Sequence, residues 1–167
     1  WPSIIKSVMM TWITPAANRE GTLGHHAHLA EHFSAFYQQF WQLPQIPAIT
    51  LELCRLRLAQ LHSSDTEWQR IEVSVSPEQR NSLQQWPTAG CFNSAEQACL
   101  AFTEVYAMDV QSISDELADA VKLHYQDAGL VALIEALGVF DGMTRMSLMW
   151  ELPVENAASQ SATKGEG

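Results

Sequence analysis

Apolar residues recur every three or four positions along most of this chain, and this period favours helices over strands. The first clear stripe is followed by Pro44 and Pro47, which end a helix because proline cannot donate its backbone hydrogen bond. Its members are Leu29, Phe33, Phe36, Tyr37 and Phe40. The spacing predicts an amphipathic helix over these residues.

The next segment, residues 49–61, is ambiguous in its pattern. Ile49-Thr-Leu-Glu-Leu53 alternates with the period of two that is typical of a strand. The segment is nevertheless rich in Leu, Arg, Glu, Gln and Ala, and β-branched residues occur only at its start. Composition and length therefore predict a helix here.

Capping signals predict the remaining helices. Ser76 precedes Pro77, and Ser94 precedes an acidic and amide-rich first turn with Gln97 at the capping-box position. Ser114 opens a further helix with acidic residues in its first turn. A long last helix is expected after Asp127, with one face formed by Leu130, Leu133, Ile134, Leu137, Asp141, Thr144, Arg145 and Leu148. We find no convincing strand pattern, so the predicted class is all-α.

Composition limits the partners and the number of domains. The 167 residues include 47% hydrophobic ones, which suits a single globular domain over residues 1–152, followed by a polar, disordered tail over 153–167. The net charge of −10 repels nucleic acids and anionic membrane surfaces. No apolar run approaches the roughly 18 to 20 residues that a membrane-spanning helix needs. We therefore expect no nucleic-acid or membrane partner.

The three cysteines, Cys54, Cys91 and Cys99, have no regular spacing and form no Cys-x-x-Cys pair. An odd number without a pattern is a poor disulfide framework. A reducing compartment, the cytoplasm, fits this usage best.

A resemblance to a known family starts at Glu52. The segment from Glu52 through Leu-Arg-Leu-Ala-Gln-Leu61 to Glu67-Trp68 resembles the signature of the carboxymuconolactone decarboxylase and AhpD-like alkylhydroperoxidase superfamily. Weaker similarities continue in the same order through residues 76–87, 92–103, 124–127 and the last helix as far as Arg145, so that about residues 20–152 are covered. The resemblance implies an AhpD-like helical bundle that assembles into homo-oligomers, often trimers or hexamers.

The chain departs from the family pattern where that pattern carries its chemistry. The signature usually reads Cys-x-x-Cys-x-x-x-His, and here these positions hold Ser64, Glu67 and Ile71. Thiol peroxidase chemistry requires a thiolate and a resolving thiol, which neither Ser64 nor Glu67 can supply. Glu67 followed by Trp68 resembles the decarboxylase-like branch instead, although that branch usually keeps a histidine where this chain has Ile71.

The candidate catalytic residues are Glu52, Glu67, His62 and Ser64. Glu52 and Glu67 lie fifteen residues apart, and on consecutive helices of the fold that the resemblance implies they could meet as an acid and base pair. The alternative is that Glu52 pairs with Arg55 or Arg145 while Glu67 is solvated. His62 could replace the missing base if it turns inward, or it is a half-exposed residue at a helix end.

Trp68 and Arg145 are the candidate ligand-binding residues. An arginine in an otherwise apolar helical pattern, such as Arg57 or Arg145, needs an acidic partner or an anionic ligand. A structural ion pair is the simpler interpretation of both arginines.

A short motif raises the question of a metal. His28-Leu-Ala-Glu31-His32 matches the His-x-x-Glu-His pattern of inverted zincin peptidases. At 100° per residue the two histidines lie to one side of the apolar stripe, at the flank of the helix. We therefore predict no metal site, and no cofactor.

Two functional hypotheses from different classes follow. The first is a carboxymuconolactone-decarboxylase-like protein that binds a small organic molecule and, if active, performs acid and base chemistry of the lyase type without thiols or a metal. The second is a catalytically degenerate scaffold that serves oligomerisation or ligand binding. An alkylhydroperoxidase-like antioxidant ranks third.

Overall fold

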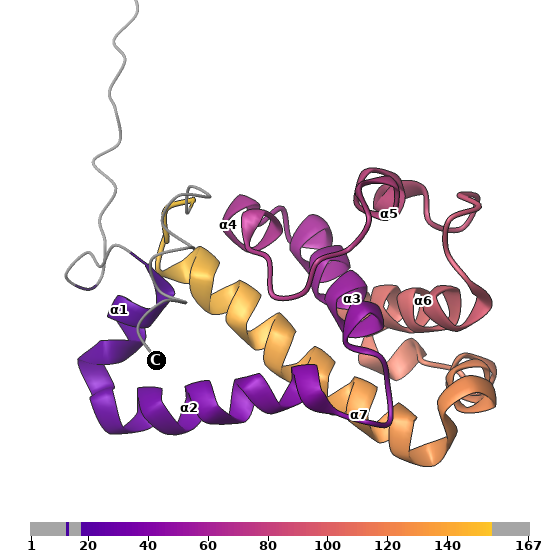
Figure 1. Cartoon of the computed structure of the whole chain (residues 1–167), viewed down its shortest axis with the longest axis horizontal. Helices are drawn as coiled ribbons and strands as arrows, with labels where there is room; N and C mark the ends of the chain where they lie inside the picture. The colour runs from indigo at the N-terminus through magenta and orange to yellow at the C-terminus, as the bar shows by residue number, and fades with distance from the viewer. Residues whose placement is uncertain (1–12, 14–17, 155–167) are drawn as a thin grey trace, which may run out of the picture.

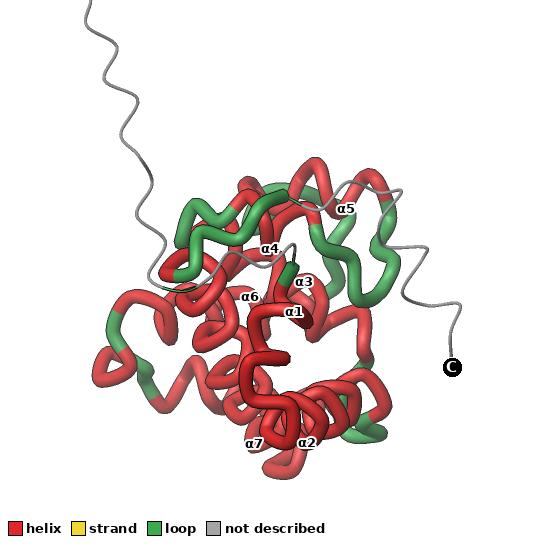
Figure 2. Tube along the Cα trace, turned by 90° about the vertical axis from the view of Figure 1, so that its left-hand side faces the viewer, coloured by secondary structure: helices red, strands yellow, loops and turns green. Residues whose placement is uncertain are grey.

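The computed structural model describes residue 13 and residues 18–154, and every regular element among them is a helix (Figures 1 and 2). The α-helices are α1 (Arg19–Leu23), α2 (Ala27–Gln39), α3 (Ala48–Leu61), α4 (Asp65–Gln69), α5 (Pro77–Ser82), α6 (Ser94–Met108) and α7 (Asp115–Met149). Short 3-10 helices lie at Gly24–His26, Phe40–Gln42, Leu83–Gln85 and Val110–Ser112. The all-α prediction is confirmed.

Helices α3, α6 and α7 pack against one another and form the centre of the molecule. The ambiguous segment is α3, and nine consecutive or near-consecutive residues of it are buried, from Thr50 to Ala59. A helix that is covered on all sides needs no single apolar stripe, which explains why its sequence alternates without a helical period. Glu52 and Arg55 are therefore carried into the interior by the central helix.

The largest group of buried apolar side chains joins α2, α3, α6 and α7. Within it the ring of Trp41 stacks on that of Phe140, with centroids 5.1 Å apart, and Tyr37 meets the same phenylalanine edge-on. A second group, which includes Leu53, Leu83 and Phe92, packs α3 against α6 and the turns around α5. These two groups hold α3 in place from opposite sides.

The backbone bends sharply in the C-terminal third. Gln126, at φ 59° and ψ −172°, interrupts the helical geometry inside α7. The segment predicted to begin after Asp127 therefore forms the long second part of α7. Figure 1 shows its C-terminal end beside α1, which turns back from the start of α2.

Two details of the sequence-based prediction were wrong. The cap of α6 is Asn93 with Glu96 as its capping-box partner, one residue before the predicted Ser94 and Gln97. The buried face of α7 also differs from the predicted one. It consists of Gly129, Ala132, Leu133, Ala136, Leu137, Phe140, Met143, Thr144 and Ser147, whereas Ile134, Arg145 and Leu148 are exposed.

No helix among the described residues is long and apolar enough to cross a membrane. The tail predicted to be disordered lies, from residue 155 onward, outside the residues that the structure describes.

Candidate functional site

Glu52 and Arg55 form the base of a buried charged cluster. They lie one turn apart on α3 and are 0% and 1% exposed, respectively. The Nε and Nη2 atoms of Arg55 donate to the two carboxylate oxygens of Glu52 over 2.8 and 2.7 Å. This two-point contact fixes the planar guanidinium against the carboxylate. Of the two arginines that the alternative interpretation offered as partners of Glu52, the structure shows the contact with Arg55.

Glu67 reaches the same guanidinium from α4. Ser64 caps this helix by accepting a hydrogen bond from the Glu67 backbone N–H over 3.4 Å, and both residues are buried. Arg55 Nη1 donates to the Glu67 carbonyl oxygen over 2.8 Å and lies 3.4 Å from its carboxylate. Arg55 thus brings Glu52 and Glu67 to one place, with its guanidinium between the two carboxylates.

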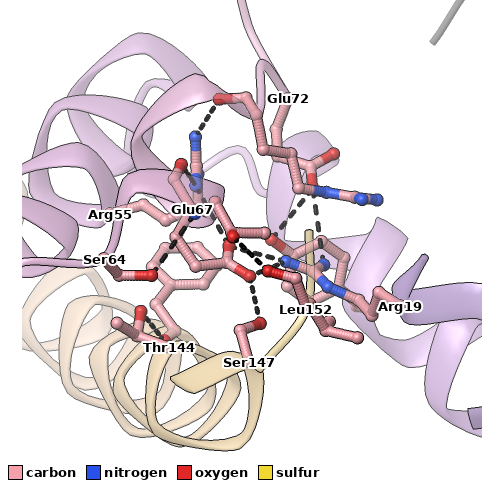
Figure 3. Close-up of polar contacts among 12 residues, drawn as sticks. Arg19, Arg55, Ser64, Glu67, Glu72, Thr144, Ser147 and Leu152 are labelled. Carbon is pink, nitrogen blue, oxygen red and sulfur yellow. Dashed lines mark hydrogen bonds and ion pairs between the residues drawn. The ribbon is translucent and has the colours of Figure 1, made fainter. Parts of the chain in front are cut away.

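Arg19 of α1 covers Glu67 from the other side (Figure 3). Its Nη2 atom donates to both carboxylate oxygens of Glu67, over 2.8 and 2.7 Å. Ser147 of α7 donates to Glu67 Oε1 over 2.5 Å, and the Arg19 guanidinium lies 5.3 Å from the centre of the Tyr37 ring. Glu67 therefore binds groups from three other helices, and it is not the solvated acid of the alternative interpretation.

Glu72 and Arg70 form the rim of the cluster. Arg70 Nε donates to Glu72 Oε1 over 2.7 Å, and the Tyr37 hydroxyl donates to the same oxygen over 3.2 Å. Arg19 Nη1 is 3.6 Å from it. At the surface, Arg70 also binds Glu20 of α1. The cluster thus contains three carboxylates, Glu52, Glu67 and Glu72, and three guanidiniums, Arg19, Arg55 and Arg70.

The surroundings shift the carboxyl pKa values in opposite directions. Burial raises the pKa of Glu52, against the lowering effect of Arg55. Burial also works to raise the pKa of Glu67, but Arg19, Ser147 and Arg55 outweigh it and lower that pKa. The two carboxyls differ because the cationic and hydroxyl partners of Glu67 outweigh its burial, whereas Arg55 does not outweigh that of Glu52.

Very little free space remains above the cluster. A cavity of about 10 Å³ is lined by Arg19, Thr66, Glu67, Arg70, Leu152 and Pro153. This is about the volume that a single water molecule requires. A molecule larger than water fits beside Glu67 only if side chains that line this cavity, such as Arg19, move.

Three other predicted site residues lie outside the cluster. His62 ends α3, where its Nε2 atom is 2.6 Å from Asp141 of α7, and no contact joins it to Glu52 or Glu67. Arg145 binds the same aspartate over 2.7 Å and is largely exposed. The simpler interpretation of Arg145 as an ion-pair residue matches this contact.

Trp68 packs under the Arg80 guanidinium, which lies 4.3 Å from its ring centre. It also lines an open groove of about 590 Å³, together with Arg57, Ser64 and Gln84. Trp68 therefore faces a different part of the surface from the cavity above Glu67. Ile71, which occupies the family's histidine position, is 48% exposed.

The cysteines and the histidine motif lie away from the cluster. Cys54 and Cys99 are buried and Cys91 is half-buried, all without disulfides. Burial raises the pKa of the Cys54 thiol to about 12. The rings of His28 and His32 meet edge-on with centroids 4.5 Å apart. Within residue 13 and residues 18–154, no three His, Cys, Asp or Glu side chains come together to hold a metal ion.

Sequence reasoning missed four members of the cluster, namely Arg19, Tyr37, Arg70 and Glu72. Tyr37 was assigned only to the apolar stripe, and Arg19 lies just before the region covered by the family resemblance. Ser147 was missed as well, because the predicted face of α7 did not include it. Arg55 could have indicated a buried charged cluster from the sequence, because a charged residue in the middle of a buried apolar helix requires several partners.

Comparison with known proteins supports the fold. The chain resembles a solved structure of the debrominase Bmp8, a cysteine-to-alanine variant in complex with 2,3,4-tribromopyrrole, with a TM-score of 0.74 and 15% sequence identity. The similarity covers 87% of this chain and 80% of that one. No protein-family model and no curated protein matches the sequence. At this sequence identity the likeness shows the all-helical fold alone.

Proposed function

We propose that this chain is a carboxymuconolactone-decarboxylase-like protein that binds a small organic molecule at the charged cluster. One observation carries the proposal. Glu52 and Glu67, which occupy the positions that the family resemblance singles out, meet at Arg55 and have pKa values shifted in opposite directions. The Bmp8 debrominase structure, which holds a small heteroaromatic molecule in the same fold, agrees with this class of ligand.

Acid and base chemistry of the lyase type on such a molecule would centre on Glu67, which borders the cavity and would exchange a proton with the bound molecule. Glu52, whose two oxygens both accept from Arg55, would hold that guanidinium in place. Arg55 would act as a positioning residue, because it touches both carboxylates. Neither His62 nor a thiol takes part in this scheme.

A binding screen tests the proposal. A panel of small neutral, anionic and cationic molecules, with 2,3,4-tribromopyrrole among them, is titrated against the wild type and the Glu67→Gln variant. We expect at least one molecule to bind the wild type and to lose its affinity in the variant. Glu104→Gln is the matched control, because Glu104 binds Arg57 and Trp86 outside the cluster. Binding that is unchanged in Glu67→Gln would place the ligand elsewhere and contradict the proposal.

The second candidate function is that of a degenerate scaffold for oligomerisation. It is favoured by the nearly closed cavity above Glu67 and by large apolar side chains that stay exposed on α2 and α7. These are Leu29, Phe36, Leu123, Val131, Ile134, Leu148 and Met149. Such surface is commonly covered by further subunits, so we propose a homo-oligomer. The family resemblance favours a trimer or hexamer, and the irregular cysteine spacing favours the cytoplasm. Light scattering that reports a monomer at micromolar concentration would contradict the oligomer.

A further inference from the structure

We propose that the space occupied by the Arg19 side chain is a receptor for a small organic cation that carries an alkylguanidinium group, and that Arg19 is its built-in substitute. The inference rests on the proposed function, in which the cluster binds a small molecule, and it adds the chemical class of the ligand. Figure 3 shows the Arg19 side chain entering the cluster between Glu67, Glu72 and Leu152.

The groups around the Arg19 guanidinium form a site suited to that shape and charge. Glu67 offers both carboxylate oxygens, at 2.7 and 2.8 Å, and Glu72 offers a third oxygen at 3.6 Å. The Tyr37 ring lies 5.3 Å away, within the range in which an aromatic ring attracts a cation. All three residues are held by other contacts, with Ser147, Arg70 and the aromatic core, so the site does not depend on Arg19 for each of its members.

Arg19 fits this site less well than Arg55 fits its own. All five N–H groups of Arg55 have acceptors, which are the oxygens of Glu52, Glu67 and the Arg70 backbone. The Nε atom of Arg19, by contrast, is buried without a hydrogen-bond partner. A buried unpaired donor costs free energy. A free alkylguanidinium, which has no chain to restrict its position, could turn to satisfy each of its N–H groups.

The position of Arg19 in the chain makes exchange feasible. It is the first residue of α1, a helix of only five residues, whereas Arg55 lies in the middle of the buried central helix α3. A short terminal helix has few contacts of its own and opens at a lower free-energy cost than a central one. The described contacts that tie α1 to the cluster are those of Arg19 and Glu20.

The net charge around the space that Arg19 occupies favours a cationic ligand. With Arg19 in place, three carboxylates face three guanidiniums. When Arg19 leaves, three carboxylates face two guanidiniums, and Glu67 loses its two shortest arginine contacts. A buried carboxylate that lacks a cation is unfavourable, so the vacated space favours a positive group over a neutral or negative one.

The test is a titration of the Arg19→Ala variant with ethylguanidinium chloride, at constant ionic strength, by isothermal titration calorimetry. We expect this variant to bind ethylguanidinium on the order of tenfold more tightly than the wild type, because the tethered Arg19 no longer competes. N-ethylurea, which has nearly the same shape but no charge, should not bind. Adding Glu67→Gln to Arg19→Ala should abolish the binding, whereas Arg57→Ala, which removes an arginine outside the cluster, should leave the wild-type affinity unchanged.

A second measurement uses the wild type, in case Arg19→Ala does not fold. Ethylguanidinium should speed the hydrogen exchange of the α1 backbone amides, because it displaces Arg19, and N-ethylurea should not. Equal binding of the two compounds, or binding that survives Glu67→Gln, would overturn the cation receptor. If the Arg19→Ala variant instead binds neutral or anionic molecules in a Glu67-dependent manner, the cation assignment fails and the proposed function stands. If no molecule of any class binds, both fail.

Discussion

Arg55 and Arg57 are two residues apart on α3, yet they lie in opposite surroundings. Arg55 is 1% exposed and all its donors are used inside the cluster. Arg57 is 13% exposed and pairs with Glu104, which also accepts a hydrogen bond from Trp86. The difference shows how burial changes the consequence of losing an ion pair. At the edge of the molecule water replaces a lost partner, whereas in the interior the remaining charge stays unsolvated.

The largest expected effect is the difference in the free energy of unfolding between the Arg55→Ala and Arg57→Ala variants. Arg55→Ala leaves Glu52 buried without its cation and removes contacts to Glu67, so we expect a loss of about 3 to 5 kcal/mol in the free energy of unfolding. Arg57→Ala should cost about 1 kcal/mol or less. Urea denaturation followed by tryptophan fluorescence measures both. Equal losses in the two variants would mean that water reaches the cluster.

The pH dependence of stability should distinguish Glu67 from Glu52. The pKa of Glu67 is lowered on folding, so its stabilisation is complete above the ordinary value of 4.5 and is lost as the pH falls through the lowered pKa. The pKa of Glu52 is raised, so its contribution is complete below 4.5 and is lost as the pH rises through the raised pKa. The two carboxyls thus act in opposite directions.

Urea titrations at a series of pH values test this opposition. As the pH falls below about 4.5, the stability difference between the wild type and Glu67→Gln should narrow. As the pH rises above about 4.5, the wild type should lose stability relative to Glu52→Gln, because the raised pKa of Glu52 makes its contribution disappear with increasing pH. Parallel curves for the two variants would show that their pKa values do not separate as the cluster predicts.

The sequence could predict features that depend on neighbouring residues, but not those that depend on contacts between distant parts of the chain. Helix periods and capping serines located α2, α3, α5, α6 and α7 but not the short α1 and α4, because these signals are local and need several turns; Ser76 and Ser114 cap α5 and α7 as predicted. Glu52 and Glu67 were found because a family signature marks both. Arg19 carries no such signal, since its role depends on α1 folding back onto α4, a contact between residues 48 positions apart. The exposed face of α7 was misassigned for a related reason, because Ile134 and Leu148 are apolar but face outward.

The cysteines show the same difference between a buried and a more accessible position, here for thiol groups. Cys54 is completely buried on α3, and burial raises its pKa to about 12, whereas Cys91 is half-buried in a loop. A thiol reagent such as Ellman's reagent should therefore label one cysteine quickly in the native protein and three after unfolding. Since no Cys-x-x-Cys pair exists, we also expect no dithiol-dependent peroxidase activity. Peroxidase turnover that is lost on Cys54→Ser would contradict this view of the thiol.

Substitution of His28 and His32, on the exposed surface of α2, should have the smallest effect on stability. Their rings touch each other, both side chains are exposed, and no third ligand joins them among the described residues. Zinc in a catalytic site needs a further protein ligand and an open position for substrate. Replacing both histidines by alanine should therefore change the unfolding free energy by no more than about 0.5 kcal/mol, as is usual for surface substitutions. It should also leave ligand binding at the cluster unchanged. Stoichiometric zinc in the untagged protein that is lost in the double variant together with function would make α2 the active region, and the buried cluster around Arg55 would then be a purely structural element.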